Sequence, residues 1–218
     1  MHFSGDFEAL EKVDLSGVCD LVEFRLDSLD TAAPCLREAM DRLTVPSIIT
    51  ARHPEEGGDR SLSNDERHRL LCSFLPHADA IDIEIRSLPE LAPVLEEAGR
   101  AGVSVILSHH DFEETPDPAE LQRIVERAAE AGADMAKIAT RLNSVADLFT
   151  LTGLFERPAP IPVSAMGMGK LGRVSRLLLA QCGSRLNYGY LTRSNAPGQW
   201  PAARLKELIA ELCVKPGA

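Results

Sequence analysis

The chain has 218 residues, of which 44% are hydrophobic and 26% are charged. This composition is typical of a soluble globular protein with a substantial core, and it excludes a disordered chain. The 33 acidic residues outnumber the 23 lysines and arginines, which gives a formal net charge of −10. A negative surface disfavours nonspecific binding to nucleic acid or to an anionic membrane, so we expect neither kind of partner.

Five cysteines are spread along the chain without any CxxC pair. An odd, widely spaced set favours neither a disulfide framework nor a zinc cage. The amino terminus lacks a basic region followed by an apolar one, and no segment reaches the roughly 20 apolar residues of a membrane helix. We therefore predict an unexported protein of the reducing cytoplasm, organised as one domain over residues 1–218.

Short runs rich in Val, Ile and Ala alternate along the chain with longer amphipathic stretches. The runs predict strands at 21–27, 47–52, 80–85, 103–110, 135–140, 161–166 and 186–192. Their starts lie roughly 23 to 33 residues apart, which is room for a strand, a helix and two short loops. With a weakly marked opening strand near residues 1–5, they predict a (β/α)8 TIM barrel with a short amino terminus and a reduced first strand.

An open doubly wound sheet is the alternative architecture. It would normally have a glycine-rich first turn, whereas the glycine-dense stretch of this chain, at 166–172, comes late. The intervening segments carry signals for helix starts: Ser63 with Glu66, Asp117 before Pro118, and Ser144 with Asp147. Glycines at 102, 132 and 183 mark expected helix ends.

Charged residues occupy one face of several predicted strands. In EFRLD at 23–27, Glu23, Arg25 and Asp27 share a side because side chains alternate along a strand, and Asp82 shares a side with Glu84. The outer face of a barrel packs against helices, so these polar faces should point towards the axis. A solvated edge strand would explain one such strand, but five strands with this pattern predict a central polar site.

Lys137 is the only charged residue in the middle of the predicted strand MAKIAT. A buried lysine can be salt-bridged, or it can be an amine nucleophile if burial and nearby cations lower its pKa. His109 and His110 end the preceding strand. One of them is expected to be structural and the other a general acid or base. A lysine imine beside a histidine base predicts proton abstraction next to a carbonyl, followed by elimination or aldol cleavage.

The glycine-rich segment at 166–176 opens a predicted helix and contains Arg173 and Arg176. Free amides and guanidinium groups at such a place can hold a carboxylate or phosphate, although a tight turn explains the glycines equally well. Two loops, 52–60 and 192–201, follow predicted strand ends and are candidate lids; ordinary turn chemistry is the alternative.

These pieces together resemble type I 3-dehydroquinate dehydratase, a Schiff-base dehydratase of the shikimate pathway. The matching segments are EFRLD at 23–27, TAR at 50–52 with EEGG at 55–58, IDIE at 81–84, SHHDF at 108–112, AKIA at 136–139, MGxxGxxSR ending at Arg176, and APGQ at 196–199. They occur in the order of that family and extend from residue 23 to residue 199. The resemblance implies a (β/α)8 barrel, no metal or organic cofactor, and a homodimer.

The resemblance also implies a role for each residue. Lys137 would form an imine with the ketone of 3-dehydroquinate, His110 would move the proton from C2 to the departing C1 hydroxyl, and Glu56 would pair with His110. The residues implied in substrate binding are Glu23, Arg25 and Arg52 at the hydroxyls and ring, Arg176 with Gln199 at the carboxylate, and Asn195 where the family commonly has serine.

Two other functions remain open at this level. A class I aldolase or transaldolase would also use a strand lysine, but it would call for a glycine-rich phosphate site after the last strands, and no clear one is present. A binding or regulatory barrel with a vestigial site is the second alternative, since a fold does not prove activity. Its expected mark is loss of Lys137 or His110, and both are present.

Overall fold

The computed structural model describes residues 2–3, 15–29, 35–191, 194 and 198–212. Seven parallel strands form one sheet in the order β1-β2-β3-β4-β5-β6-β7. They are β1 (His2–Phe3), β2 (Val22–Arg25), β3 (Ser47–Thr50), β4 (Ala80–Glu84), β5 (Ser104–Asp111), β6 (Met135–Arg141) and β7 (Val163–Met168). Each strand pairs with the next in sequence, which is the order of a barrel and rules out the doubly wound alternative.

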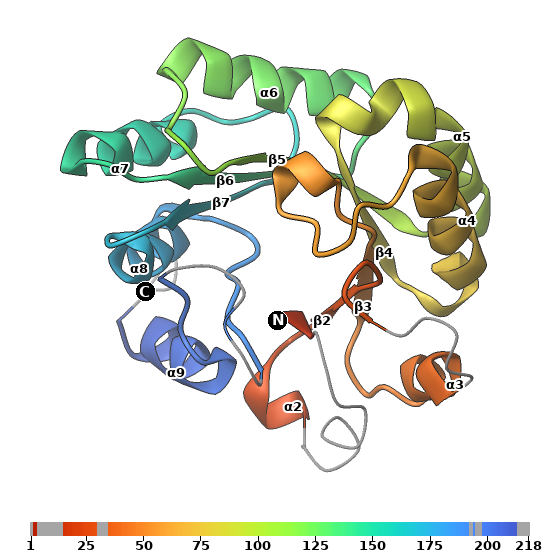
Figure 1. The fold of residues 1–218 in the computed structure, drawn as a ribbon. Helices are drawn as coiled ribbons and strands as arrows, with labels where there is room; N and C mark the ends of the chain where they lie inside the picture. The colour runs from red at the N-terminus through yellow and green to blue at the C-terminus, as the bar shows by residue number, and fades with distance from the viewer. Residues whose placement is uncertain (1, 4–14, 30–34, 192–193, 195–197, 213–218) are drawn as a thin grey trace.

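Helices cover the outside of the curved sheet (Figure 1). The α-helices are α2 (Leu15–Val18), α3 (Cys35–Asp41), α4 (Asn64–Phe74), α5 (Leu88–Ala101), α6 (Pro118–Glu130), α7 (Val145–Thr152), α8 (Gly172–Cys182) and α9 (Ala202–Leu212). Short 3-10 turns are η1 (Pro54–Glu56), η2 (Leu75–His77), η3 (Ile85–Ser87) and η4 (Gly153–Phe155). No helix in the described part of the chain is long and apolar enough to cross a membrane.

The predicted helix starts are confirmed. Ser63 and Ser144 each close a capping box with the acidic side chain three residues on, and Asp117 accepts from the backbone N–H of Glu120. These caps satisfy amides that the first turn of a helix leaves without partners. Gly102 and Gly183 end α5 and α8 in the left-handed conformation that glycine adopts without strain.

The prediction of a strand at 186–192 is wrong for its described residues, 186–191. They contain one isolated bridge, from Tyr190 to Pro201, and no ladder. The segment runs beside β7, but side chains and the following loop take its backbone groups. Ser164 Oγ donates to the Leu186 carbonyl at 2.7 Å, and Tyr190 N–H donates to the Trp200 carbonyl at 3.0 Å. The first strand is reduced to two residues, as predicted.

The sheet register brings the polar faces together inside the barrel. Ser108 on β5 is the register partner of both Glu84 on β4 and Lys137 on β6, and Lys137 is the register partner of Ser164 on β7. All four side chains are buried. Because parallel strands in register carry equivalent positions to the same face, one polar layer crosses four neighbouring strands. The predicted central polar site is therefore present.

Candidate active site

A cavity that is open to solvent at its mouth lies at the carboxyl end of the strands. It is lined by the three predicted catalytic residues, Lys137, His110 and Glu56. Five of the six predicted binding residues also line it: Glu23, Arg25, Arg52, Arg176 and Gln199. The sixth, Asn195, lies outside the described residues. The structure thus gathers eight residues, separated by up to 176 positions in sequence, around one space.

Lys137 projects into this cavity from the middle of β6 and is 3% exposed. Its amine donates to Asp82 Oδ2 at 2.6 Å and to Glu23 Oε1 at 3.3 Å. The amine also lies 4.2 Å from the centre of the Tyr188 ring. Two carboxylates and an aromatic face therefore fix the position of the amine, while the adjoining cavity leaves room for a small molecule beside it.

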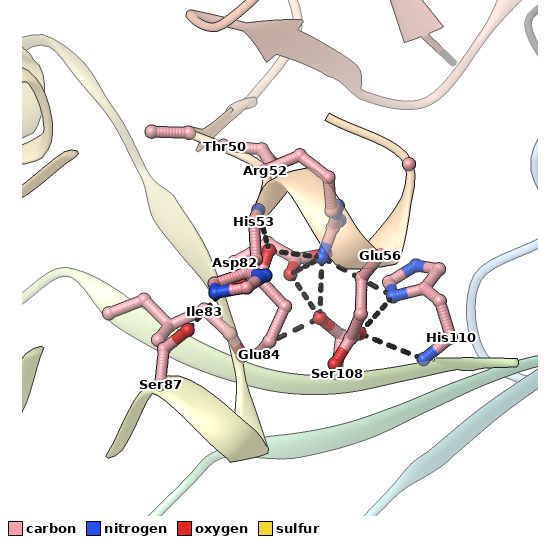
Figure 2. Close-up of polar contacts among 12 residues, drawn as sticks. Thr50, Arg52, His53, Glu56, Asp82, Ile83, Glu84, Ser87, Ser108 and His110 are labelled. Carbon is pink, nitrogen blue, oxygen red and sulfur yellow. Dashed lines mark hydrogen bonds and ion pairs between the residues drawn. The ribbon is translucent and has the colours of Figure 1, made fainter. Parts of the chain in front are cut away.

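Hydrogen bonds between Arg52, which follows β3, and Asp82, on β4, link these two strands at the centre of the site (Figure 2). Arg52 donates to both oxygens of Asp82 at 3.1 Å and to Glu84 Oε1 at 2.9 Å. Burial alone would raise the pKa of Asp82, but Arg52 and Lys137 outweigh it and hold that pKa well below its usual range. Asp82 is therefore a permanent carboxylate that links a guanidinium to an amine.

His110 is bound to Glu56 at two points (Figure 2). The backbone N–H of His110 donates to Glu56 Oε2 at 2.9 Å, and His110 Nδ1 lies 3.0 Å from the same oxygen. Burial, with the neighbouring cations Arg52 and Lys137, lowers the pKa of His110 well below its usual value. The imidazole is consequently neutral at physiological pH, which is the form that can accept a proton.

Burial, with the nearby carboxylate Glu84, raises the pKa of Glu56 from 4.5 to about 7. The Glu56 carboxyl, which contacts His110, therefore changes its protonation near neutral pH. An ionised Glu56 accepts a hydrogen bond from the Nδ1–H group of His110. Nε2 is then the ring nitrogen without a proton, and it is the basic position of the imidazole.

Arg25 is held by a bidentate pair with Asp27, at 2.8 and 2.6 Å, and by the carbonyl of Gly57 at 2.8 Å. Burial opposes ionisation of Asp27, but Arg25 outweighs it and lowers the pKa of that carboxyl. Asp27 also accepts the backbone N–H of Arg52. This carboxylate fixes the ends of two neighbouring strands, β2 and β3, and with them the two cationic side chains.

Arg176, on α8, is bound entirely by backbone carbonyls. Its guanidinium donates to the carbonyls of Gly167, Gly172 and Gly198 at 2.8–2.9 Å and to that of Tyr188 at 3.0 Å. It is 1% exposed, and burial lowers its pKa to about 10. No carboxylate in the described part of the chain pairs with it. A buried cation held only by dipoles is suited to an anionic ligand.

Gln199 lies beside Arg176 at the mouth of the cavity. Its side-chain oxygen accepts from Ser194 Oγ at 3.2 Å. The Gly198 carbonyl bound by Arg176 precedes Gln199, so the guanidinium ties down the end of the 192–201 loop. Arg173 instead stacks on Trp200 at 4.9 Å and does not line the cavity.

His109 takes the opposite side of β5 from His110. Its register partner on β6 is Ile138, and it is not among the residues that line the cavity. Burial lowers the pKa of His109, with Asp111 and Glu120 as opposing neighbours. The strand alternation therefore separates the two histidines and leaves His110 as the one that faces the cavity.

The sequence did not single out several residues of this site. Tyr188 lies against the Lys137 amine, and the hydroxyl of Tyr188 is buried with no hydrogen-bond partner among the described residues. Arg67, on α4, is fully buried, and it donates to Glu84 and to the Ala51 carbonyl. No local pattern marked Tyr188, because the segment 186–191 is not a strand and the fold alone sets its place beside Lys137. Nothing in the helical pattern of α4 marked Arg67. Phe112, Met166 and Met168 supply apolar lining.

Comparison with known proteins agrees with the family resemblance of the sequence motifs. The family model for type I 3-dehydroquinase matches residues 3–215. A 3-dehydroquinate dehydratase of Methanococcus vannielii is 37% identical over 194 residues, which cover 87% of each chain.

Two solved structures share the fold. The crystal structure of 3-dehydroquinate dehydratase from Geobacillus kaustophilus superposes with a TM-score of 0.86 and 25% identity, and it covers 97% of this chain and 89% of its own. A type I enzyme from Clostridium difficile, described with covalently modified comenic acid, has a TM-score of 0.80 and 28% identity, over 94% and 85% of the two chains. With the ordered motifs and the cavity, these matches establish that the chain belongs to the type I 3-dehydroquinase family.

Proposed function

We propose that this chain catalyses the syn dehydration of 3-dehydroquinate to 3-dehydroshikimate, a step of the shikimate pathway, through an imine on Lys137. The observation that carries the proposal is the joint position of three groups. A lysine amine, a histidine joined to Glu56, and a buried arginine without a carboxylate partner among the described residues all face one cavity. Family membership supplies the substrate class.

The imine makes the proton next to the ketone removable. The Lys137 ammonium releases one proton, and the free amine attacks the ketone carbon. That proton returns to the hydroxyl of the resulting carbinolamine, which leaves as water, and the protonated imine remains. His110 then takes a proton from C2, and the electron pair of the C–H bond moves into the imine to give an enamine. The electron pair returns and expels the C1 hydroxyl, to which His110 gives its proton. Hydrolysis of the imine releases the product and restores the amine.

One imidazole on one side of the ring performs both proton transfers, which accounts for the syn course of the reaction. The protonated imine accepts the electron pair of the C–H bond, so no redox step is needed. The proton that His110 takes from C2 leaves with the C1 hydroxyl as water. Asp82 contributes by holding the amine through its 2.6 Å hydrogen bond until the ketone arrives.

Arg176 is the proposed partner of the substrate carboxylate. The described interior of the barrel holds five buried acidic and five buried basic side chains: Glu23, Asp27, Glu56, Asp82 and Glu84, with Arg25, Arg52, Arg67, Lys137 and Arg176. Glu56 has a pKa of about 7 and is partly protonated at neutral pH. The interior as a whole therefore carries a small positive surplus. Arg176, which has no carboxylate partner among the described residues, offers a local positive charge that a carboxylate ligand would neutralise.

Replacing the amine tests the imine. Lys137→Ala should lower turnover of 3-dehydroquinate by on the order of 10⁴-fold or more, because the nucleophile is lost. Borohydride treatment of the protein with substrate should give no covalent adduct by mass spectrometry. Lys170→Ala changes an exposed lysine just beyond β7 and is the matched control, which should retain the activity and the adduct. Retention of the adduct in the Lys137 variant would exclude this nucleophile.

The two histidines give a matched pair for the proton transfer. His110→Ala should still form the borohydride-trappable imine but should lose turnover by about 10²- to 10⁴-fold, the usual contribution of a positioned acid or base. His109→Ala should retain most of its activity, because His109 faces away from the cavity. Single-turnover kinetics separates the two steps, and the reverse ranking of the variants would assign the proton transfer to His109.

Removal of the guanidinium tests the carboxylate site. Arg176→Ala should raise KM by about 10- to 100-fold, the range expected when a charged hydrogen bond is lost. Arg173→Ala, three residues earlier on the same helix, is the control and should change KM little, because its side chain stacks on Trp200. Steady-state kinetics with 3-dehydroquinate gives both values. An unchanged KM in the Arg176 variant would place the carboxylate elsewhere.

Glu56 should impose a pH dependence near neutrality. Its pKa of about 7 predicts that kcat/KM rises with pH through about 7, as the carboxyl ionises and accepts Nδ1–H of His110. Glu56→Gln should abolish this rise. A kcat/KM profile with the same inflection in both proteins would remove Glu56 from the proton-transfer pair.

The stability of the fold should show the opposite trend. The folded pKa lies above the usual 4.5, so the stabilisation from the protonated carboxyl is complete below about 4.5 and is lost as pH rises through about 7. Urea unfolding at several pH values should show this loss in the wild type and not in Glu56→Gln.

A further inference from the structure

Three potential metal ligands meet on the outer layer of the barrel, between α4 and α5. His68 and Cys72 lie on α4, and Glu97 lies on α5. One ligand atom from each residue lies within 4.8 Å of the other two, and all three side chains are half-buried. None of the three lines the cavity that contains Lys137. The cluster therefore has no part in the dehydration proposed above.

The separation of His68 and Cys72 is close to that of two ligands in a tetrahedral zinc site. His68 and Cys72 are four residues apart and share one face of α4, so both side chains point the same way. His68 Nε2 lies 3.8 Å from Cys72 Sγ. Tetrahedral bonds of about 2.0 Å to nitrogen and 2.3 Å to sulfur place these two atoms about 3.5 Å apart. The Cys72 thiol also hydrogen-bonds with the Glu97 carboxylate, which brings in the third ligand from the neighbouring helix.

We propose that His68, Cys72 and Glu97 form a binding site for a borderline divalent cation, Zn²⁺ in the first instance, with water as the fourth ligand. Imidazole, thiolate and carboxylate together match the ligand preference of zinc, whereas Mg²⁺ and Ca²⁺ select oxygen ligands throughout. The half-exposed position gives a fourth ligand access from solvent. The bound ion would link α4 to α5 and would stabilise the folded chain in proportion to its occupancy.

Binding must displace one proton from sulfur. Burial and the adjoining Glu97 carboxylate raise the pKa of the Cys72 thiol to about 11, so the thiol keeps its proton at neutral pH. The metal forms a bond to sulfur as the S–H bond breaks, and the proton passes to solvent. One proton is released for each ion bound, so the affinity for the ion should increase as the pH rises.

Cobalt(II) is the probe, because a four-coordinate cobalt thiolate has intense visible bands and a near-ultraviolet charge-transfer band from sulfur. Titration of the metal-free protein with Co²⁺ should produce both, and Zn²⁺ should displace them at one equivalent per chain. Cys72→Ser should lose the charge-transfer band, and His68→Ala and Glu97→Gln should each weaken binding by about tenfold or more. Cys182→Ser, which changes a half-buried cysteine on α8, is the matched control and should behave as the wild type.

Two further measurements keep the test decisive. Zn²⁺ should raise the melting temperature of the wild type and of Cys182→Ser but not that of Cys72→Ser, and the wild-type affinity should increase with pH as stated above. Dehydration of 3-dehydroquinate should proceed in the Cys72→Ser variant, which separates this site from the proposed function. Absence of a charge-transfer band at saturating Co²⁺, or its persistence in Cys72→Ser, would show that the cluster is a hydrogen-bonded contact between helices and not a metal site.

Discussion

The hydrogen bonds of Asp82 to Arg52 and Lys137 are the interaction on which the interior of this barrel depends. Charges inside a parallel barrel are costly unless each has a partner of opposite sign and further hydrogen bonds. Asp82 meets this requirement for two cations at once, with oxygens 3.1 Å from Arg52 and 2.6 Å from Lys137. Glu84 continues the network from Arg52 to Arg67, which reaches in from the surrounding helix layer. The charges of β4, β6, α4 and Arg52, which lies just after β3, therefore stabilise one another.

This compensation also prepares the site for chemistry. Lys137 and His110 are both fixed by hydrogen-bonded carboxylates, so little reorganisation is needed when a substrate binds. Arg176 differs from the other buried cations because backbone carbonyls, and no described carboxylate, surround it. In a chain with a net charge of −10, the cationic end of the cavity gives an anionic ligand a local site of opposite sign. The proposed substrate, a small ring acid with a ketone, fits both features.

Much of this site could be predicted because strand alternation is a local property. The polar residues of β2 and β4 lie at every second position, as do Ser108 and His110 on β5, and this alternation predicts that Glu23, Asp82 and His110 lie on the inner face. Helix starts were equally predictable, since Ser63 and Ser144 act within three residues of sequence. The segment 186–191 was mistaken for a strand because its alternation resembles one, whereas hydrogen bonds from Ser164 and Arg176 use its carbonyls. Those donors come from distant positions that no local pattern contains.

The sequence by itself determined the succession of strands and helices, the inner and outer faces of the strands, and the ordered motifs of the family. These features follow from the side-chain period and from residue identity, which are properties of short segments. The tertiary structure alone decided which charges pair: that Asp82 joins Lys137 to Arg52, that Arg67 enters from α4, and that Tyr188 covers the amine. Pairing depends on distances between segments remote in sequence, and the register and curvature of the sheet set those distances.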